Sequence, residues 1–212
     1  MSERIRKKRM KILGIILAVV VGIITLGVLI AQIYLAADMA KTEQQSYTVI
    51  WKKENLEARY YPKALMATVQ DSDGKYKSSS NKNFRVLAGY IFGGNAKKES
   101  IAMTAPVHME FGDNGSKMSF VMPKNAMLDS LPTPNDRGIK LHTANERYVV
   151  ALQFGGWADD ARIASHMKEL EQALQNLEIE PTNAPWFMGY NPPFQVFNRR
   201  NEVAVEVNKI AF

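Results

Sequence analysis

One stretch near the middle of this 212-residue chain predicts its fold: Ile101-Ala102-Met103-Thr104-Ala105-Pro106-Val107-His108-Met109-Glu110-Phe111. From Ile101 to Phe111, apolar side chains recur at every second position. Successive side chains of a strand point to opposite faces, so this alternation predicts a strand that packs on one face. His108 falls on the other face, and we therefore expect it to be exposed at a surface or a sheet edge.

The residues around this strand predict that the first half of the chain forms a strand, a helix and a hairpin. The turn 112–115 contains Asn-Gly, the strongest short hairpin signal, and the alternating stretch 118–122 follows it. Upstream, residues 84–91 place apolar side chains on one face of a helix that Gly93-Gly94 would end. Residues 56–69 have the β-branched and aromatic content of one long or broken strand.

The second half repeats this order. Residues 139–154 form two strand-like stretches, Asp159 or Asp160 can cap a helix with an apolar stripe over 163–177, and 203–207 alternate as a strand. The repeated order indicates an internal duplication. We therefore predict an α+β fold, a distorted antiparallel β-barrel built from two pseudo-symmetric strand-helix-strand-strand units with two helices outside. Closing the two sheets together removes exposed strand edges.

Short motifs occur in a fixed order along residues 47–207. They are Ala88-Gly89-Tyr90-Ile91-Phe92-Gly93-Gly94-Asn95, Ile101-Ala102-Met103-Thr104-Ala105-Pro106-Val107, Phe120-Val121-Met122-Pro123, Leu131-Pro132-Thr133-Pro134, Gln153-Phe154-Gly155-Gly156, Asn191-Pro192-Pro193-Phe194 and Arg199-Arg200-Asn201-Glu202-Val203. In this order they resemble the SOUL haem-binding family. The resemblance implies the same distorted antiparallel barrel, and a binding module for haem or another tetrapyrrole rather than an enzyme.

The resemblance also implies an apolar cleft with basic residues at its mouth. A tetrapyrrole covers its flat faces with apolar side chains, and its propionates need cationic partners because an unpaired carboxylate there is costly. The basic residue near the start of the first helix matches Lys82, and Arg85 can replace a second basic position, where this chain has Gln195. The ligand-binding residues that we expect are Met66, Lys82, Phe84, Arg85, Leu87, Ile91 and Met103. No histidine stands in a recognisable axial-ligand context, so the metal ligand is left unassigned.

Two other functions remain open. The first is a carrier or sensor of other planar hydrophobic or cationic molecules, in which the carboxylate of Glu202 would meet a cation; alternatively, Glu202 forms a buried pair with an arginine that locks the terminal strand. The second is a structural or protein-interaction domain without a ligand. Catalysis is not expected, because Ser165 and His166 are neighbours on a helix and point about 100° apart, which prevents a direct Ser–His hydrogen bond.

The N-terminus predicts a membrane anchor. Residues 12–37 contain no charged side chain, and at about 1.5 Å per helical residue they exceed the hydrocarbon thickness of about 30 Å. The basic cluster within residues 1–11 favours a cytoplasmic N-terminus. We therefore expect a single-pass protein of the plasma (inner) membrane whose C-terminal domain is periplasmic or extracellular. A cleaved signal peptide is the competing interpretation, but its apolar region spans only about 7–15 residues; a buried soluble helix is another.

The positive charge is local. The chain has 27 Lys or Arg and 21 Asp or Glu, and residues 1–11 carry six of the basic side chains with one Glu. The rest of the chain is nearly neutral and has no Gly-rich phosphate loop, so nucleic-acid binding is not expected. We expect a cytoplasmic N-terminus at 1–11, an anchor at 12–37, a linker at 38–46 and a SOUL-like haem-binding domain at 47–212. The chain lacks cysteine, which excludes disulfides.

Overall fold

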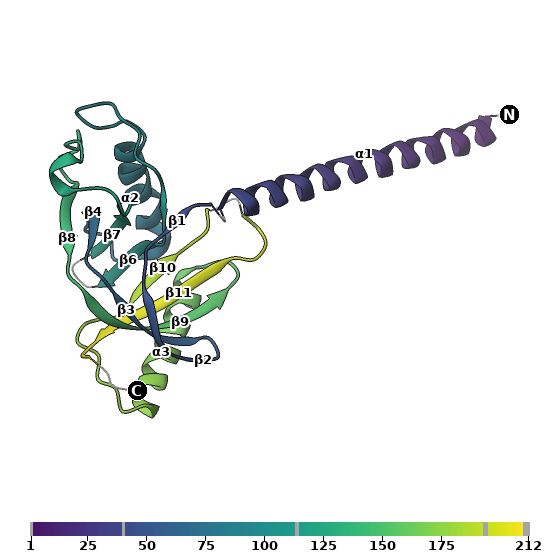
Figure 1. Cartoon of the computed structure of the whole chain (residues 1–212). Coiled ribbons are helices and arrows are strands. Elements are labelled where there is room, and N and C mark those ends of the chain that lie inside the picture. Colours follow the sequence, from purple (N-terminus) through teal and green to yellow (C-terminus); the bar gives the residue numbers. More distant parts are fainter. Residues whose placement is uncertain (1, 40, 113–114, 193–194, 210–212) are drawn as a thin grey trace. The chain divides into compact units, whose positions relative to one another are not determined.

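The computed structural model describes residues 2–39, 41–112, 115–192 and 195–209 (Figure 1). Its contacts divide the chain into two units, one comprising residues 1–41 with 195–197 and the other the remaining residues. In the first unit, α1 runs without interruption from Ser2 to Met39. Its segment Arg6–Tyr34 contains an 18-residue window with a mean hydropathy of 3.0 and no buried residue, and by length and composition the segment can cross a membrane.

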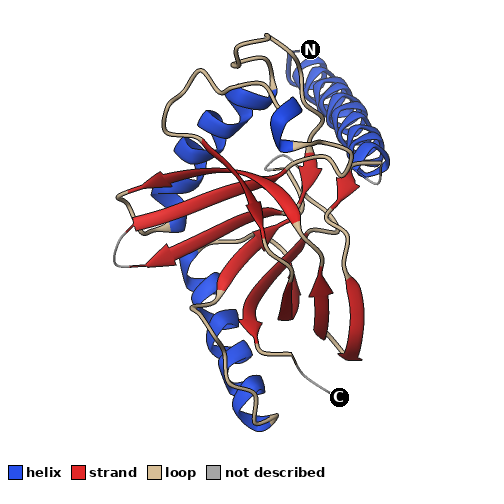
Figure 2. Cartoon of the chain, turned by 60° about the vertical axis from the view of Figure 1, so that its left-hand side comes forward, coloured by secondary structure: helices blue, strands red, loops and turns tan. Residues whose placement is uncertain are grey.

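The second unit has the α+β fold predicted from the sequence, and this prediction is confirmed. Nine strands form one antiparallel sheet in the order β2-β3-β9-β11-β10-β6-β7-β4-β8, curled into a half-barrel (Figure 2). The strands are β2 Thr48–Lys53, β3 Leu56–Tyr61, β4 Ala64–Asp71, β6 Val107–Gly112, β7 Gly115–Val121, β8 Lys140–Ala144, β9 Arg147–Gly155, β10 Trp186–Gly189 and β11 Arg200–Val207. The helices are α2 Tyr76–Ile91 and α3 Asp160–Asn176, with the 3-10 turn η1 at Leu128–Ser130.

The expected duplication is visible in the strand order. One repeat is β4-α2-β6-β7 and the other is β9-α3-β10-β11, and the two meet where β6 pairs with β10. The strand that precedes each repeat joins the other one, since β3 pairs with β9 and β8 pairs with β4. Each repeat therefore extends the other's half of the sheet. The hairpin between β6 and β7 is also confirmed, with Gly112 opposite Gly115; the Asp-Asn of its turn lies outside the described residues.

Helix α2 begins two turns before the apolar stripe that predicted it. The reason is that its buried face starts with polar residues, Ser79 and Asn83, before Leu87 and Ile91. Asn83 is satisfied by donating to Ser116 Oγ at 3.2 Å. The C-terminal end was predicted correctly, since Gly93 adopts a left-handed backbone with φ 101°, which glycine tolerates without a Cβ clash.

Two aspartates at the start of α3 organise both helices. Asp159 caps α3 by accepting a hydrogen bond from the backbone N–H of Arg162 at 2.8 Å, which confirms one of the two predicted caps. The carboxylate of Asp160 accepts from the backbone N–H groups of Tyr76 and Lys77 at 2.8 and 3.3 Å. A negative charge is favourable at the positive end of a helix, so α3 supplies the cap that α2 lacks in its own sequence.

The main core lies between the sheet and its two helices (Figure 2). The alternating apolar residues of β6, β7, β9 and β11 face α2 and α3 there, as the period-2 pattern requires. Its buried members include Val69, Leu87, Ile91, Met109, Met118, Phe120, Val150, Leu152, Ile163, Leu170, Leu174, Val203 and Val205. A smaller buried cluster occupies the opposite face of the sheet, with Tyr61, Val149, Ala151, Trp186, Met188, Tyr190 and Ala204.

The polar segment before residue 47 contains a further strand. In it, β1 (Glu43–Gln44) pairs in parallel with β5 (Thr104–Ala105). The next residue, Gln45, is buried and its backbone N–H donates to Ala105 O at 2.8 Å. These hydrogen bonds join the segment to the second unit from residue 43 onward.

Candidate functional site

The sheet face opposite the helices carries a buried group of charged and tyrosine side chains. We call it the Glu202 cluster and define it as Tyr47, Lys52, Glu57, Arg59, Tyr61, Tyr190, Arg200 and Glu202. Along β11, Val203 and Val205 point into the core with the helices, so the alternating Glu202 and Ala204 point to the other face. The same alternation along β3 places Glu57, Arg59 and Tyr61 together on that face.

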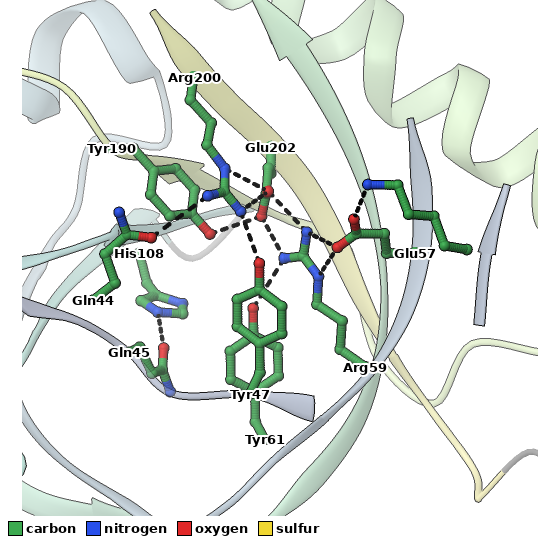
Figure 3. Close-up of polar contacts among 11 residues, drawn as sticks. Gln44, Gln45, Tyr47, Glu57, Arg59, Tyr61, His108, Tyr190, Arg200 and Glu202 are labelled. Atoms are coloured by element: carbon green, nitrogen blue, oxygen red, sulfur yellow. Dashed lines mark hydrogen bonds and ion pairs between the residues drawn. The ribbon is translucent and has the colours of Figure 1, made fainter. Parts of the chain in front are cut away.

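Glu202 is fully buried at the centre of this cluster (Figure 3). Its carboxylate accepts two hydrogen bonds from the Arg59 guanidinium, Nη1 to Oε2 at 2.7 Å and Nη2 to Oε1 at 2.9 Å. Arg200 donates to Oε1 through Nη2 at 2.7 Å, and the hydroxyl of Tyr190 donates to Oε2 at 2.8 Å. Both carboxylate oxygens therefore accept strong hydrogen bonds, and two of the three donor residues, Arg59 and Arg200, are cationic.

The outer members of the cluster satisfy the two arginines. Arg59 Nε donates to Glu57 Oε2 at 2.8 Å, and Lys52 Nζ lies 2.8 Å from the other oxygen of Glu57. Arg59 also donates to the hydroxyl of Tyr61 at 3.1 Å. On the other side, Arg200 donates to the hydroxyl of Tyr47 at 3.0 Å (Figure 3). The network joins strands far apart in the sequence, because Arg59 is 143 residues from Glu202.

The ionisation of the cluster follows from these contacts. Burial alone raises the pKa of Glu202, but the hydrogen bonds and charge of Arg59, with those of Arg200, outweigh it and lower the pKa below its usual value. Burial lowers the pKa of Arg59, and the Glu202 carboxylate more than reverses this effect and raises it. Burial raises the pKa of Tyr61 to about 12. The cluster is therefore a fixed network of ions and neutral tyrosines.

This geometry decides between the two interpretations of Glu202. A carboxylate that receives a cationic ligand must have an oxygen without a strong donor, and Glu202 has none. The prediction of a buried Arg–Glu pair is confirmed; that it locks the terminal strand stays a prediction. Arg59 and the three tyrosines were not among the residues expected from the sequence. The charged residues Glu57 and Arg59, alternating with apolar residues in β3, were the signal that could have indicated them.

His108 contradicts the expectation of an exposed histidine. It is 3% exposed on the same face as the Glu202 cluster, and its Nε2 lies 2.8 Å from Gln45 Oε1 (Figure 3). The expectation was wrong because β1 and Trp186 cover this face of β6. Burial, with the nearby charge of Arg147, lowers the pKa of His108 to about 3, so the imidazole is neutral.

Trp186 and Arg147 form a second polar feature on this face. The Arg147 guanidinium lies 4.8 Å from the centroid of the Trp186 ring, a cation–π distance. Within the described part of the chain, the buried indole N–H of Trp186 has no acceptor.

The other two histidines are also engaged. His142 Nε2 lies 2.9 Å from the hydroxyl of Thr68. His166 Nδ1 lies 2.9 Å from Glu169 Oε2, and its ring stacks on Phe154 at 4.1 Å. Each of the three histidines therefore has one ring nitrogen within hydrogen-bond distance of another side chain of the chain. Among the described residues, no group of three or more His, Cys, Asp or Glu side chains could hold a metal ion.

The expected ligand-binding residues of α2 lie on two sides of the helix. Leu87 and Ile91 are buried against the sheet, and Phe84 is half-buried with its ring 5.3 Å from Phe120. Lys82 and Arg85 are exposed. Lys82 pairs with Asp71 at 2.8 Å, with 68% of its side chain exposed. The helix thus brings two cations to the surface above an apolar layer.

The two expected methionines are separated. Met66 alternates with Ala67 and Val69 on β4, and because these two residues are in the core with α2, Met66 points to the opposite face. Met103 is 40% exposed in the segment after α2. Phe92, at the end of the helix, is 62% exposed. Met103 and Phe92 are therefore the apolar side chains that this end of α2 offers to a ligand.

An open hollow of about 750 Å³ lies at the start of α2. Its lining residues are Ser72, Asp73, Gly74, Lys75, Phe111 and Gly112. It is next to Asp71, the partner of Lys82. The hollow is shallow and mostly polar, with Phe111 as the aromatic side chain of its lining, so it lacks the enclosed apolar walls of a typical ligand site.

Comparison of folds places the second unit among α+β half-barrel domains. The crystal structure of the EcmrR C-terminal domain superposes with a TM-score of 0.54 at 14% sequence identity, covering 77% of this chain and 99% of that one. A hydrolase from Listeria innocua gives a TM-score of 0.53 at 9% identity, covering 75% of this chain and 94% of that one. At these identities the likeness concerns the fold alone.

Within this class, the chain belongs to the SOUL heme-binding protein family, whose family model matches residues 42–206. It is 28% identical over 172 residues to heme-binding protein 1 of Sus scrofa, covering 76% of this chain and 90% of that protein. It is 30% identical over 144 residues to heme-binding protein 1 of Bos taurus, covering 65% and 75%. Human heme-binding protein 2 is 26% identical over 155 residues, covering 69% and 75%. The resemblance noted in the sequence is confirmed.

Proposed function

We propose that this chain is a membrane-anchored protein that binds haem or a related tetrapyrrole. The observation that carries the proposal is the family match over residues 42–206, together with relatives named heme-binding protein. The surface of α2 supports it, because Lys82 and Arg85 present exposed cations for propionates and Phe84 of the same helix is half-buried. No nucleic acid is part of this function.

The proposed site uses the residues expected from the sequence in two ways. Lys82 and Arg85 meet the acidic groups of the ligand, and Phe84 and Met103 contact its apolar surface. Leu87 and Ile91 support this surface from beneath, while Met66 is buried on the opposite face of the sheet and is not part of it. When bound, haem would supply its iron for small-molecule or redox chemistry, while the protein's part is to hold the macrocycle. The Met103 thioether is exposed and is of a type that binds haem iron.

A carrier of cationic molecules is the second candidate. Its best residue would be Glu202, but both oxygens of that carboxylate are bound by arginines and Tyr190. Displacing these partners would leave buried guanidinium groups without acceptors, which is costly. We therefore prefer a ligand with acidic side groups.

Titration with hemin tests the proposed site. The full chain in lipid nanodiscs should give a saturable Soret shift that nanodiscs without protein do not give. Charge reversal by Lys82→Glu should raise the Kd about fivefold, which corresponds to roughly 1 kcal/mol for an exposed charged contact. The porphyrin dimethyl ester, which lacks the acidic groups, should bind both proteins equally.

The matched control for this titration is Lys168→Glu, an exposed charge reversal on α3. It should leave the Kd for hemin unchanged. If the wild-type chain gives no saturable shift, tetrapyrrole binding is wrong. If Lys82→Glu and Lys168→Glu weaken hemin equally, the effect is one of net charge and the assignment of Lys82 is wrong.

The anchor has its own test. Because Arg6–Tyr34 is long and apolar enough to span a bilayer, the full chain should remain in the membrane fraction after washing with alkaline carbonate. A reporter that works only in the cytoplasm should be silent at the C-terminus, since the basic N-terminus favours the cytoplasmic side. Extraction by carbonate would contradict the anchor, and an active reporter would reverse the topology.

A further inference from the structure

We propose that the loop 195–197 is a lipid-contacting surface that rests in the outer interface of the bilayer beside α1. This inference rests on the proposed membrane anchor and goes beyond it, because it assigns a second, peripheral contact with lipid. The partner is the interfacial region of a phospholipid bilayer, where apolar and aromatic side chains are favourable.

The first observation is the hydrogen bond of Gln32 within the first unit. Gln32 lies in the apolar segment of α1, two residues before Tyr34, the last residue of the candidate span. Its Oε1 accepts a hydrogen bond from the backbone N–H of Val196 at 2.9 Å. A primary amide in or near hydrocarbon is costly without a partner. The loop therefore meets α1 at the level where the span reaches the interface.

The second observation is the shape of the loop itself. Gln195 is buried, and its Nε2 donates to Phe197 O at 2.9 Å. Asn198 follows in the left-handed region with φ 52°, a conformation that asparagine tolerates better than most residues. This turn leaves Val196 and Phe197 pointing outward, 46% and 56% exposed. Two adjacent apolar side chains at a loop tip match an interfacial contact.

The experiment uses the absence of cysteine from the chain, which lets a single introduced cysteine carry a unique spin label. Labels are placed in the full-length protein in liposomes through Val196→Cys and Phe197→Cys. Power saturation compares collisions with oxygen, which concentrates in lipid, and with a water-soluble nickel chelate. The ratio of oxygen to nickel accessibility should be several-fold higher at both positions than at Val49→Cys, a comparably exposed apolar position on β2.

A label at Leu17→Cys, inside the candidate span, separates this inference from the anchor on which it rests. If position 17 is in lipid and the two loop labels are as accessible to nickel as position 49, the anchor stands and the peripheral contact is overturned. If position 17 is itself accessible to nickel, both are overturned.

Discussion

Replacing Glu202 by alanine should lower the free energy of unfolding by about 3–5 kcal/mol, because it leaves the buried Arg59 guanidinium without its main acceptor. Arg200 loses the same partner but keeps the hydroxyl of Tyr47. The measurement is urea unfolding of the full chain in detergent, followed by tryptophan fluorescence. Its three tryptophans, Trp51, Trp157 and Trp186, all lie outside α1, so the signal reports the second unit.

Glu110→Ala is the control for Glu202→Ala. Glu110 and its partner Lys117 are 48% and 40% exposed, so losing this ion pair should cost less than about 1 kcal/mol. The double replacement Arg59→Met with Glu202→Leu removes both buried charges and should recover part of the lost stability. Equal effects of Glu202→Ala and Glu110→Ala would show that the Glu202 cluster contributes no more than a surface pair.

Acid should destabilise the protein through His108 before most carboxylates titrate. Burial lowers the pKa of His108 in the folded state to about 3, while its pKa in the unfolded state is near 6.5. Between these two pKa values the unfolded state binds a proton at His108 and the folded state does not. The free energy of unfolding therefore has its full value above pH 6.5 and falls as the pH drops toward 3. The slope is about 1.4 kcal/mol per pH unit, or roughly 3 kcal/mol from about pH 7 to about pH 4.

His108→Gln isolates this term, since glutamine keeps a hydrogen-bond donor for Gln45 but does not titrate. The free energy of unfolding of this variant should be flatter with pH than that of the wild type between about pH 6.5 and 4.5. The comparison is of slopes and not of absolute stabilities, because the substitution also changes packing against Trp186. Parallel slopes would show that His108 is protonated in the folded state.

The residue pattern alone determined the local elements. The alternation from Ile101 to Phe111 and the Asn-Gly turn predicted the β6–β7 hairpin, because side-chain direction in a strand depends only on position. Asp159 predicted the start of α3, and Gly93 the end of α2, since a cap and a left-handed residue act on neighbouring backbone. The length and apolarity of Arg6–Tyr34 likewise need no tertiary contact.

The sequence predicted the site less completely. The ordered motifs indicated the family, and Arg200–Glu202 indicated a buried ion pair, which the structure confirms. The residues expected to line one cleft are spread over both faces of the sheet, because Met66 alternates with the core residue Ala67. The surface cations Lys82 and Arg85 could be assigned only through the resemblance, since a lysine or arginine on a helix surface has no distinguishing pattern.

Only the tertiary structure decided which polar residues are buried and by what. Arg59 meets Glu202 across 143 residues because β3 and β11 both pair with β9, and no local spacing encodes that neighbour. His108 is buried because a segment more than sixty residues earlier, at Gln45, covers its face of the sheet. The start of α2 was not predicted from the apolar pattern, because the polar residues Ser79 and Asn83 occupy its buried face there. A polar side chain can be buried where a partner satisfies it, and that partner is supplied by the fold.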